Sequence, residues 1–190
     1  MESFGFEDPF SSLRDRLNRR LLDARTVVIN EALTSTVAGQ VSQQLVVLDN
    51  EPDDPIQMLM SSAPEGEGLS LYDLLRSMEA PVTILGSGRI SGAGVLCFVG
   101  VPSARRFALP HAQFQFTESD VAVEPGSAAD LSGEADRVRQ RRERMVEILA
   151  SATGQAASQV DADLEGRRTF DADETARYGL RNYLKTTVRL

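Results

Sequence analysis

The chain has 190 residues, 42% of them hydrophobic and 25% charged, and carries a formal net charge of −8 at pH 7. These values are ordinary for a globular protein, and the length suits one domain with a sizeable core. The negative charge argues against a nucleic acid or an anionic membrane as partner. No apolar run approaches the ~20 residues of a membrane span, the N-terminus lacks a basic-then-apolar signal, and the single cysteine, Cys97, excludes an internal disulfide. A cytoplasmic location is therefore expected.

Short apolar or β-branched runs predict strands, and apolar residues three or four positions apart predict helices. After an N-terminal arm at 1–10, a cap pattern at Ser12 predicts the start of a short amphipathic helix with Leu13, Leu17 and Leu21 on one face. Strands are predicted at 26–30, 56–60, 82–85, 106–109 and 113–116, and helices around 37–45, around 71–75 and over 91–100. Strands that alternate with helices at this spacing indicate βαβ units and a mainly parallel sheet.

A long helix is predicted after an acidic, turn-rich segment. Apolar residues recur at three-, four- and seven-residue steps over 131–152, and Gly154 ends the pattern. The opposite face of this helix, 137–144, is densely basic. It is either an ordinary solvated face or a salt-bridge surface between subunits. Two further cap patterns follow, at 158–161 and 171–174, and the second predicts a helix that stops at Gly179.

Ser91 is the candidate nucleophile. It lies between small residues, after one apolar run and before a helix-like apolar run, which is typical of a nucleophile at the start of a helix. Serine is a poor nucleophile at neutral pH until a neighbouring base accepts its proton, and the only histidine of the chain is His111. The simpler interpretation is that Ser91 is a helix N-cap.

Several segments, in the same order along the chain, resemble the proteolytic subunit of the Clp protease. They are LLDARTVVI at 21–29, YD at 72–73, the serine segment at 91–100, RFALP at 106–110, TGQ at 153–155 and ETARYGL at 174–180. The resemblance runs from about residue 20 to 182. It implies an α/β fold of the Clp-protease and crotonase type, with repeated ββα units in a head domain and a long protruding handle helix near 131–153.

The resemblance also implies a division of the chain and an assembly. Residues 1–20 are an N-terminal arm with the start of the first helix, 21–117 the core of the head, 118–155 the handle region, and 156–190 the C-terminal part of the head. Family members form heptameric rings, two of which stack through their handles into a closed chamber. Unfoldase ATPases dock on the ring faces.

Placed on the family's Ser/His/Asp triad, the chain matches only the nucleophile. Ser91 falls on the serine position, but the histidine position is Thr117, nine residues after Ala108, and the aspartate position is Arg167. Threonine cannot act as a general base near neutral pH, and a guanidinium would repel an imidazolium. His111 lies six residues before Thr117, on the order of 20 Å away along an extended chain, whereas a working base needs roughly 3 Å. Asp163 and Glu165 are near the acid position, but no histidine is present for them to orient.

The oxyanion site also departs from the family pattern. The family has a glycine pair whose N–H groups approach the developing oxyanion. In the segment 62–65 the chain has Pro64 and Glu65 instead. Proline has no N–H, and Glu65 would bring negative charge towards a negative transition state. Gly92 follows Ser91, and its N–H is the donor that remains.

Three functions are therefore considered. The first is a catalytically inactive structural or regulatory subunit that assembles, in homo- or hetero-oligomeric rings, with an active paralogue into an ATP-dependent Clp peptidase. The second is an active serine endopeptidase that uses Ser91 by an atypical mechanism. The third is a crotonase-like acyl-CoA enzyme with Glu65 or Glu67 as base. No cofactor and no metal are expected. Leu59 stands where the family has a docking tyrosine, so weak docking of an unfoldase ATPase is expected.

Overall fold

Five parallel strands form the central sheet of the structure, a computed structural model that describes residues 9–51, 53–61, 68–117, 128–181 and 183–184. In sheet order the strands are β1 (Thr26–Ile29), β2 (Ile56–Met60), β3 (Val82–Gly86), β5 (Arg106–Ala108) and β8 (Tyr183–Leu184). Every neighbouring pair is parallel. The mainly parallel sheet predicted from the alternating pattern is confirmed.

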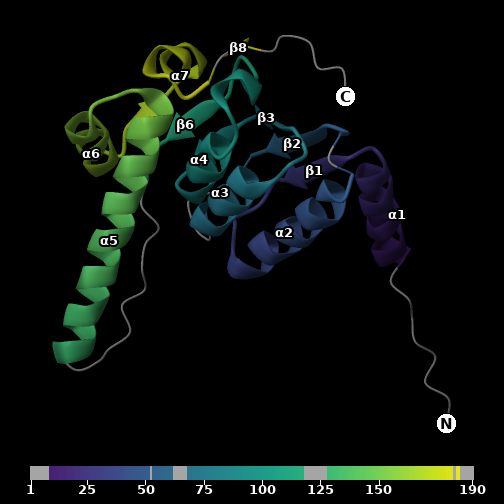
Figure 1. The fold of residues 1–190 in the computed structure, drawn as a ribbon, viewed down its shortest axis with the longest axis horizontal. Helices are drawn as coiled ribbons and strands as arrows, with labels where there is room; N and C mark the ends of the chain where they lie inside the picture. Colours follow the sequence, from purple (N-terminus) through teal and green to yellow (C-terminus); the bar gives the residue numbers. More distant parts are fainter. Residues whose placement is uncertain (1–8, 52, 62–67, 118–127, 182, 185–190) are drawn as a thin grey trace.

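Helices cover this sheet in the order that the periodicity predicts. They are α1 (Pro9–Asp23), α2 (Ser35–Asp49), α3 (Gly68–Ser77) and α4 (Ala93–Val99), and a single 3-10 turn, η1 (Ser103–Arg105), follows α4. In Figure 1, α2 and α3 lie side by side in front of the sheet, and the two helices contact each other. Buried residues of α2 recur every three or four positions because only one face of that helix meets the core: Ala38, Val41, Leu45 and Leu48. In contrast, every residue of α4 is buried.

A second, three-stranded sheet carries the candidate site. Its order is β4 (Arg89–Ser91), β6 (Gln113–Gln115) and β7 (Thr169–Phe170); β4 and β6 are parallel, and β6 and β7 are antiparallel. One face of this sheet is apolar and fully buried, with Ile90, Phe114 and Phe170. The ring of Phe114 meets that of Phe98 in α4 edge-on, with 4.8 Å between centroids. The successions β3–β4–α4 and β5–β6–α5 follow the predicted ββα order.

The long helix α5 (Ala128–Thr153) has 26 residues, and Figure 1 shows its N-terminal half extending away from both sheets. Its C-terminal half packs on the core through Met145, Ile148 and Leu149. Two short helices follow, α6 (Ala157–Glu165) and α7 (Ala172–Tyr178), and α6 lies beside α5. The prediction of a long protruding helix is thus confirmed.

Arg106, the first residue of the RFALP segment, ties the ends of two helices to β5. Its buried guanidinium donates to the carbonyl oxygens of Val101 at 2.7 Å, Val99 at 2.9 Å and Ala152 at 3.2 Å. Val99 ends α4, and Ala152 lies one residue before the end of α5. Burial lowers the pKa of Arg106 to about 10, so the side chain stays a cation at neutral pH. A cation at two helix C-termini complements their dipoles.

The cap patterns predicted from the sequence have mixed outcomes. Asp171 caps α7 as predicted, with a complete capping box to Glu174, and Gly179 ends that helix with φ 96°. Any Cβ on Gly179 would overlap the carbonyl oxygen of Thr153, so this turn against α5 requires glycine. The cap predictions at Ser12 and Ser158 are wrong.

The helices α1 and α6 both begin before the residue that the cap pattern indicated. The structure starts α1 at Pro9, so Ser12 lies inside the helix; proline suits the first helical position because its missing N–H has no partner there. The N-cap of α6 is Ala156, and Ser158 is the second residue of the helix. The buried Val160 and Leu164, four positions apart, set the phase of α6, and the helix begins almost one turn before Val160. The remainder of the predicted arm at 1–10 lies outside the described residues.

Among the helices that the structure describes, none is long and apolar enough to cross a membrane.

Candidate catalytic site

Ser91 is the last residue of β4 and is 0% exposed. The strand pairs it with Gln115 of β6, which keeps its backbone extended. Gly92 follows as the N-cap of α4, with φ 48° and ψ −115° and no side-chain cap bond. The interpretation of Ser91 as the N-cap is therefore wrong by one residue, because the ladder to β6 holds Ser91 in the strand.

The strand pairing places the three triad positions at one end of the three-stranded sheet. Ser91 ends β4, and Thr117 follows two residues after Gln115, its partner in the parallel strand β6. On the other side of β6, the Phe116 N–H donates to the Arg168 carbonyl oxygen at 2.9 Å, which extends the antiparallel register with β7. Thr117 follows Phe116 and Arg167 precedes Arg168, so both residues adjoin this hydrogen bond, with Arg167 in a turn. The strand topology thus brings to one end of the sheet the three positions that counting along the family-like segments indicates.

The chemistry at these positions is not that of a relay. Thr117 is 8% exposed, and its Oγ1 has no hydrogen-bond partner among the described residues. A hydroxyl can donate or accept a hydrogen bond there, but it has no lone pair basic enough to take the serine proton. His111 is exposed and precedes β6, so it lies at the opposite end of that strand from Ser91. His111 lies in the turn between β5 and β6.

Arg167 occupies the turn after α6 with a positive φ of 48°, and its N–H donates to the Leu164 carbonyl oxygen at 3.0 Å. The nearest buried carboxylate along the chain is Asp163 in α6, whose side chain is 8% exposed. Asp163 accepts hydrogen bonds from the Tyr178 hydroxyl at 2.7 Å and from Arg168 Nη1 at 3.1 Å. Burial raises the pKa of Asp163, but the hydrogen bonds from Tyr178, Gln159 and Arg168 together outweigh burial and hold that pKa below its ordinary value.

Asp163 lies on the wrong face of the sheet to orient a base at position 117. Its partner Tyr178 packs its ring against Phe116, with 5.6 Å between centroids, and against Phe170 at 4.6 Å. Successive side chains of an extended chain point to opposite faces, so Phe116 and Thr117 diverge. The cluster of Asp163, Tyr178 and the two phenylalanines therefore stabilises the back of the site. Sequence reasoning missed this cluster. The only signal available for it was Tyr178, in the family-like segment 174–180.

The described residues include one possible oxyanion donor. The Gly92 N–H donates to the Gln115 carbonyl oxygen at 3.3 Å. Pro64, Glu65 and Glu67 lie outside the described residues, so the predictions made for them stay predictions. The residues that flank this segment are described: the Ser61 N–H donates to the Ile29 carbonyl oxygen at 2.7 Å, and Gly68 packs directly on the backbone of Ala93. Gly68, the first described residue after this segment, therefore lies against the residue that follows Gly92.

Neither another nucleophile nor a metal centre replaces the relay within the described parts of the chain. Cys97 is buried in α4, and burial raises the pKa of its thiol to about 12, which keeps it protonated and unreactive. Nowhere in those parts do three or more His, Cys, Asp or Glu side chains gather in a way that could hold a metal ion.

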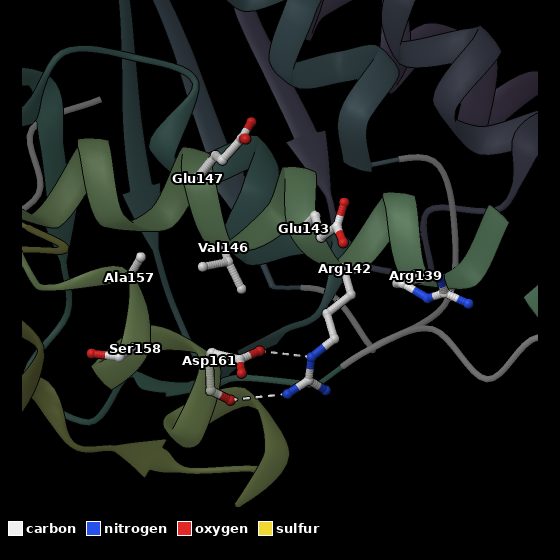
Figure 2. Close-up of a pocket in the computed structure, with 8 residues that line it drawn as sticks. All are labelled: Arg139, Arg142, Glu143, Val146, Glu147, Ala157, Ser158 and Asp161. Atoms are coloured by element: carbon white, nitrogen blue, oxygen red, sulfur yellow. Dashed lines mark hydrogen bonds and ion pairs between the residues drawn. The ribbon is translucent and has the colours of Figure 1, made fainter. Parts of the chain in front are cut away.

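A separate groove of about 530 Å³ lies between α5 and α6 (Figure 2). It is lined by Arg139, Arg142, Glu143, Val146, Glu147, Ala157, Ser158 and Asp161. Figure 2 shows the Arg142 guanidinium reaching across to α6, where Nε is 2.7 Å from Asp161 Oδ1 and Nη2 is 3.1 Å from the Asp161 carbonyl oxygen. The groove is lined by charges of both signs, and its lining includes neither a histidine nor a cysteine.

The basic face at 137–144 is partly neutralised within the chain. Arg139 pairs with Asp136 at 3.0 Å and Arg144 with Glu147 at 3.5 Å, in addition to the pair between Arg142 and Asp161. The unbalanced positive charge that the sequence suggested is thus smaller in the structure, which favours the interpretation of an ordinary solvated face.

Comparison with known proteins agrees with the fold. The family model described as Clp protease matches residues 12–186. The chain is 30% identical over 177 residues to the ATP-dependent Clp protease proteolytic subunit 3 of Streptomyces avermitilis, covering 91% of this chain and 80% of that protein. It is 29% identical over 185 residues to subunit 2 of Pseudomonas aeruginosa, covering 96% and 91%. The solved structure of ClpP1 from Listeria monocytogenes superposes with a TM-score of 0.78 at 26% identity, covering 90% of this chain and 97% of that one.

The fold is that of the Clp proteases. The chain belongs to the Clp protease family. It resembles the family's proteolytic subunits, and the predicted fold of repeated ββα units with a long helix is confirmed.

Proposed function

We propose that this chain is a catalytically inactive proteolytic-type subunit that joins an active paralogue in the rings of an ATP-dependent Clp peptidase. The observation that carries the proposal is Thr117 at the end of β6, where the relay needs an imidazole, with His111 beyond the other end of the strand. Removing the base, the acid and an oxyanion donor each commonly lowers the rate by two or more orders of magnitude, although not additively.

An intact core supports a structural role rather than a decayed gene product. The buried side chains of both sheets and of α4 form one continuous apolar cluster. The polar anchors are also complete: Arg106 has its three carbonyl partners and α7 its capping box. A subunit whose only task is to complete a ring needs the fold and its surfaces, and it does not need the relay.

The assembly we propose is the stacked heptameric ring that the family resemblance implies, with α5 as the handle between rings. The relatives named above are proteolytic subunits of ATP-dependent proteases. For this chain we propose that an unfoldase docks mainly on the paralogue. Leu59, which takes the place of a docking tyrosine, is a half-buried residue of β2, and an aliphatic side chain offers neither the ring nor the hydroxyl of tyrosine.

The proposal is tested by co-expressing the tagged chain with a complete-triad paralogue and measuring the mass of the purified complex. We expect a mixed ring whose peptidase activity is unchanged when Ser91→Ala is introduced into this chain. The same activity should disappear when the paralogue's own serine is replaced. Failure to co-purify at any ratio contradicts the assembly, and a loss of activity with Ser91→Ala contradicts the inactivity of this subunit.

A further inference from the structure

Gly92 carries an unusual backbone conformation directly after the nucleophile position. Its φ of 48° and ψ of −115° lie in a region that residues with a Cβ rarely adopt. Its N–H donates to the Gln115 carbonyl oxygen at 3.3 Å. Because Ser91 is paired with Gln115, this bond continues the parallel ladder between β4 and β6 by one residue. The Gly92 N–H therefore points across to the neighbouring strand β6, at the Gln115 carbonyl oxygen.

We infer that the hydrogen bond from the Gly92 N–H to the Gln115 carbonyl oxygen acts as a lock: it occupies the oxyanion donor. The backbone of the site, as well as its side chains, is then unsuited to catalysis. This inference rests on the proposed function. An oxyanion donor helps only when it is free and aimed at the developing charge, and the Gly92 N–H is already held by Gln115. The surroundings agree, since Ser91 is 0% and Thr117 8% exposed. A substrate carbonyl would have to break the ladder bond before it could use this donor.

The lock makes a prediction that needs no variant. In hydrogen-exchange NMR on the full chain, we expect the Gly92 amide to exchange slowly, like the Gln113 amide. The Gln113 amide is the internal control, because it donates to the Gly88 carbonyl oxygen at 2.7 Å in the same ladder. Exchange of the Gly92 amide at the rate of an unstructured peptide, with Gln113 protected, would overturn the inference.

A second experiment tests the consequence for chemistry in a background where a base is present. In the double variant Thr117→His with Arg167→Asp, Ser91 is offered a phosphonofluoridate. The serine oxygen forms a bond to phosphorus, the P–F bond breaks, fluoride leaves, and the introduced imidazole takes the hydroxyl proton. Adding Gly92→Ala disfavours the positive φ and frees the N–H. We expect labelling to become roughly 100-fold faster, the usual effect of one oxyanion donor.

The matched control is Gly154→Ala in the same double variant. Gly154 also has a positive φ, 76°, and a Cβ there would meet no atom within 4 Å. It tests backbone strain away from the site, and we expect no change in labelling. Equal labelling with Gly92 or alanine at that position overturns the lock. Labelling of the unmodified chain would overturn the proposed inactivity instead, and if neither variant labels, the exchange measurement alone decides.

Discussion

Asp163→Asn tests whether the buried carboxylate behind the site stabilises the fold. Among its hydrogen bonds, Asp163 accepts one from Tyr178 at 2.7 Å and one from Arg168 at 3.1 Å. A hydrogen bond to a buried charged group contributes about 1.5–3 kcal/mol, whereas the partner Arg168 is 43% exposed and adds less through its charge. An asparagine keeps one acceptor oxygen and turns an N–H group towards the other partner. We expect the free energy of unfolding to fall by about 2 kcal/mol, which lowers Tm by roughly 4–8 °C.

The stability difference between wild type and Asp163→Asn should depend on pH in a definite direction. The hydrogen bonds hold the folded pKa of Asp163 below its ordinary value, so the folded state favours the carboxylate. The resulting stabilisation is complete above the unfolded pKa of about 3.9 and is lost as pH falls through the lower, folded pKa. The difference between wild type and Asp163→Asn should therefore be constant near neutral pH and shrink below about pH 4.

Urea denaturation followed by circular dichroism, from neutral to acidic pH, measures this difference. The matched control is Asp161→Asn on the same helix. Asp161 also pairs with an arginine but is 50% exposed, so its loss should change the free energy of unfolding by less than about 1 kcal/mol. Equal stability of Asp163→Asn and wild type at neutral pH, or a difference that grows as pH falls, would refute the reasoning.

Three further outcomes are expected. Arg106→Met removes all three bonds to the helix ends and should cost about 3 kcal/mol in urea unfolding, whereas Arg105→Met on the exposed neighbour should cost almost nothing; equal losses would contradict the role of Arg106. Thr117→His with Arg167→Asp should give slow turnover of fluorogenic peptides and the single changes none, and full family-like rates would show that the oxyanion site is not broken. Any assembly through α5 should loosen as salt rises, because exposed ion pairs contribute only ~0–1 kcal/mol each and are screened by salt. Light scattering that finds a monomer at low salt, with and without the paralogue, would contradict the proposal that α5 mediates assembly.

The fold could be predicted from the sequence because burial leaves a periodic trace. Strands such as 56–60 and helices such as α5 differ in period, and the order of these periods defines a parallel sheet with crossover helices. The starts of α1 and α6 could not be read in the same way. A cap pattern at Ser12 or Ser158 is a local preference, and packing of the helix on the core decides where it begins.

The part of the site that depends on position along the sequence and on strand register could be predicted. Counting along the family-like segments selects Ser91, Thr117 and Arg167, and the parallel and antiparallel pairings of β6 bring these residues to one end of a sheet. The face on which Asp163 lies could not be derived by counting along the sequence, because it depends on how α6 is placed relative to Tyr178 of α7. The bond from Gly92 to Gln115 was also hidden, since it depends on a backbone angle and not on a residue type.

The most direct test of the central claim is the turnover of small fluorogenic peptides by the purified chain, free of any paralogue. Because no imidazole reaches Ser91, we predict no turnover above that of the Ser91→Ala variant. Turnover that the wild-type chain shows and Ser91→Ala abolishes would contradict the account.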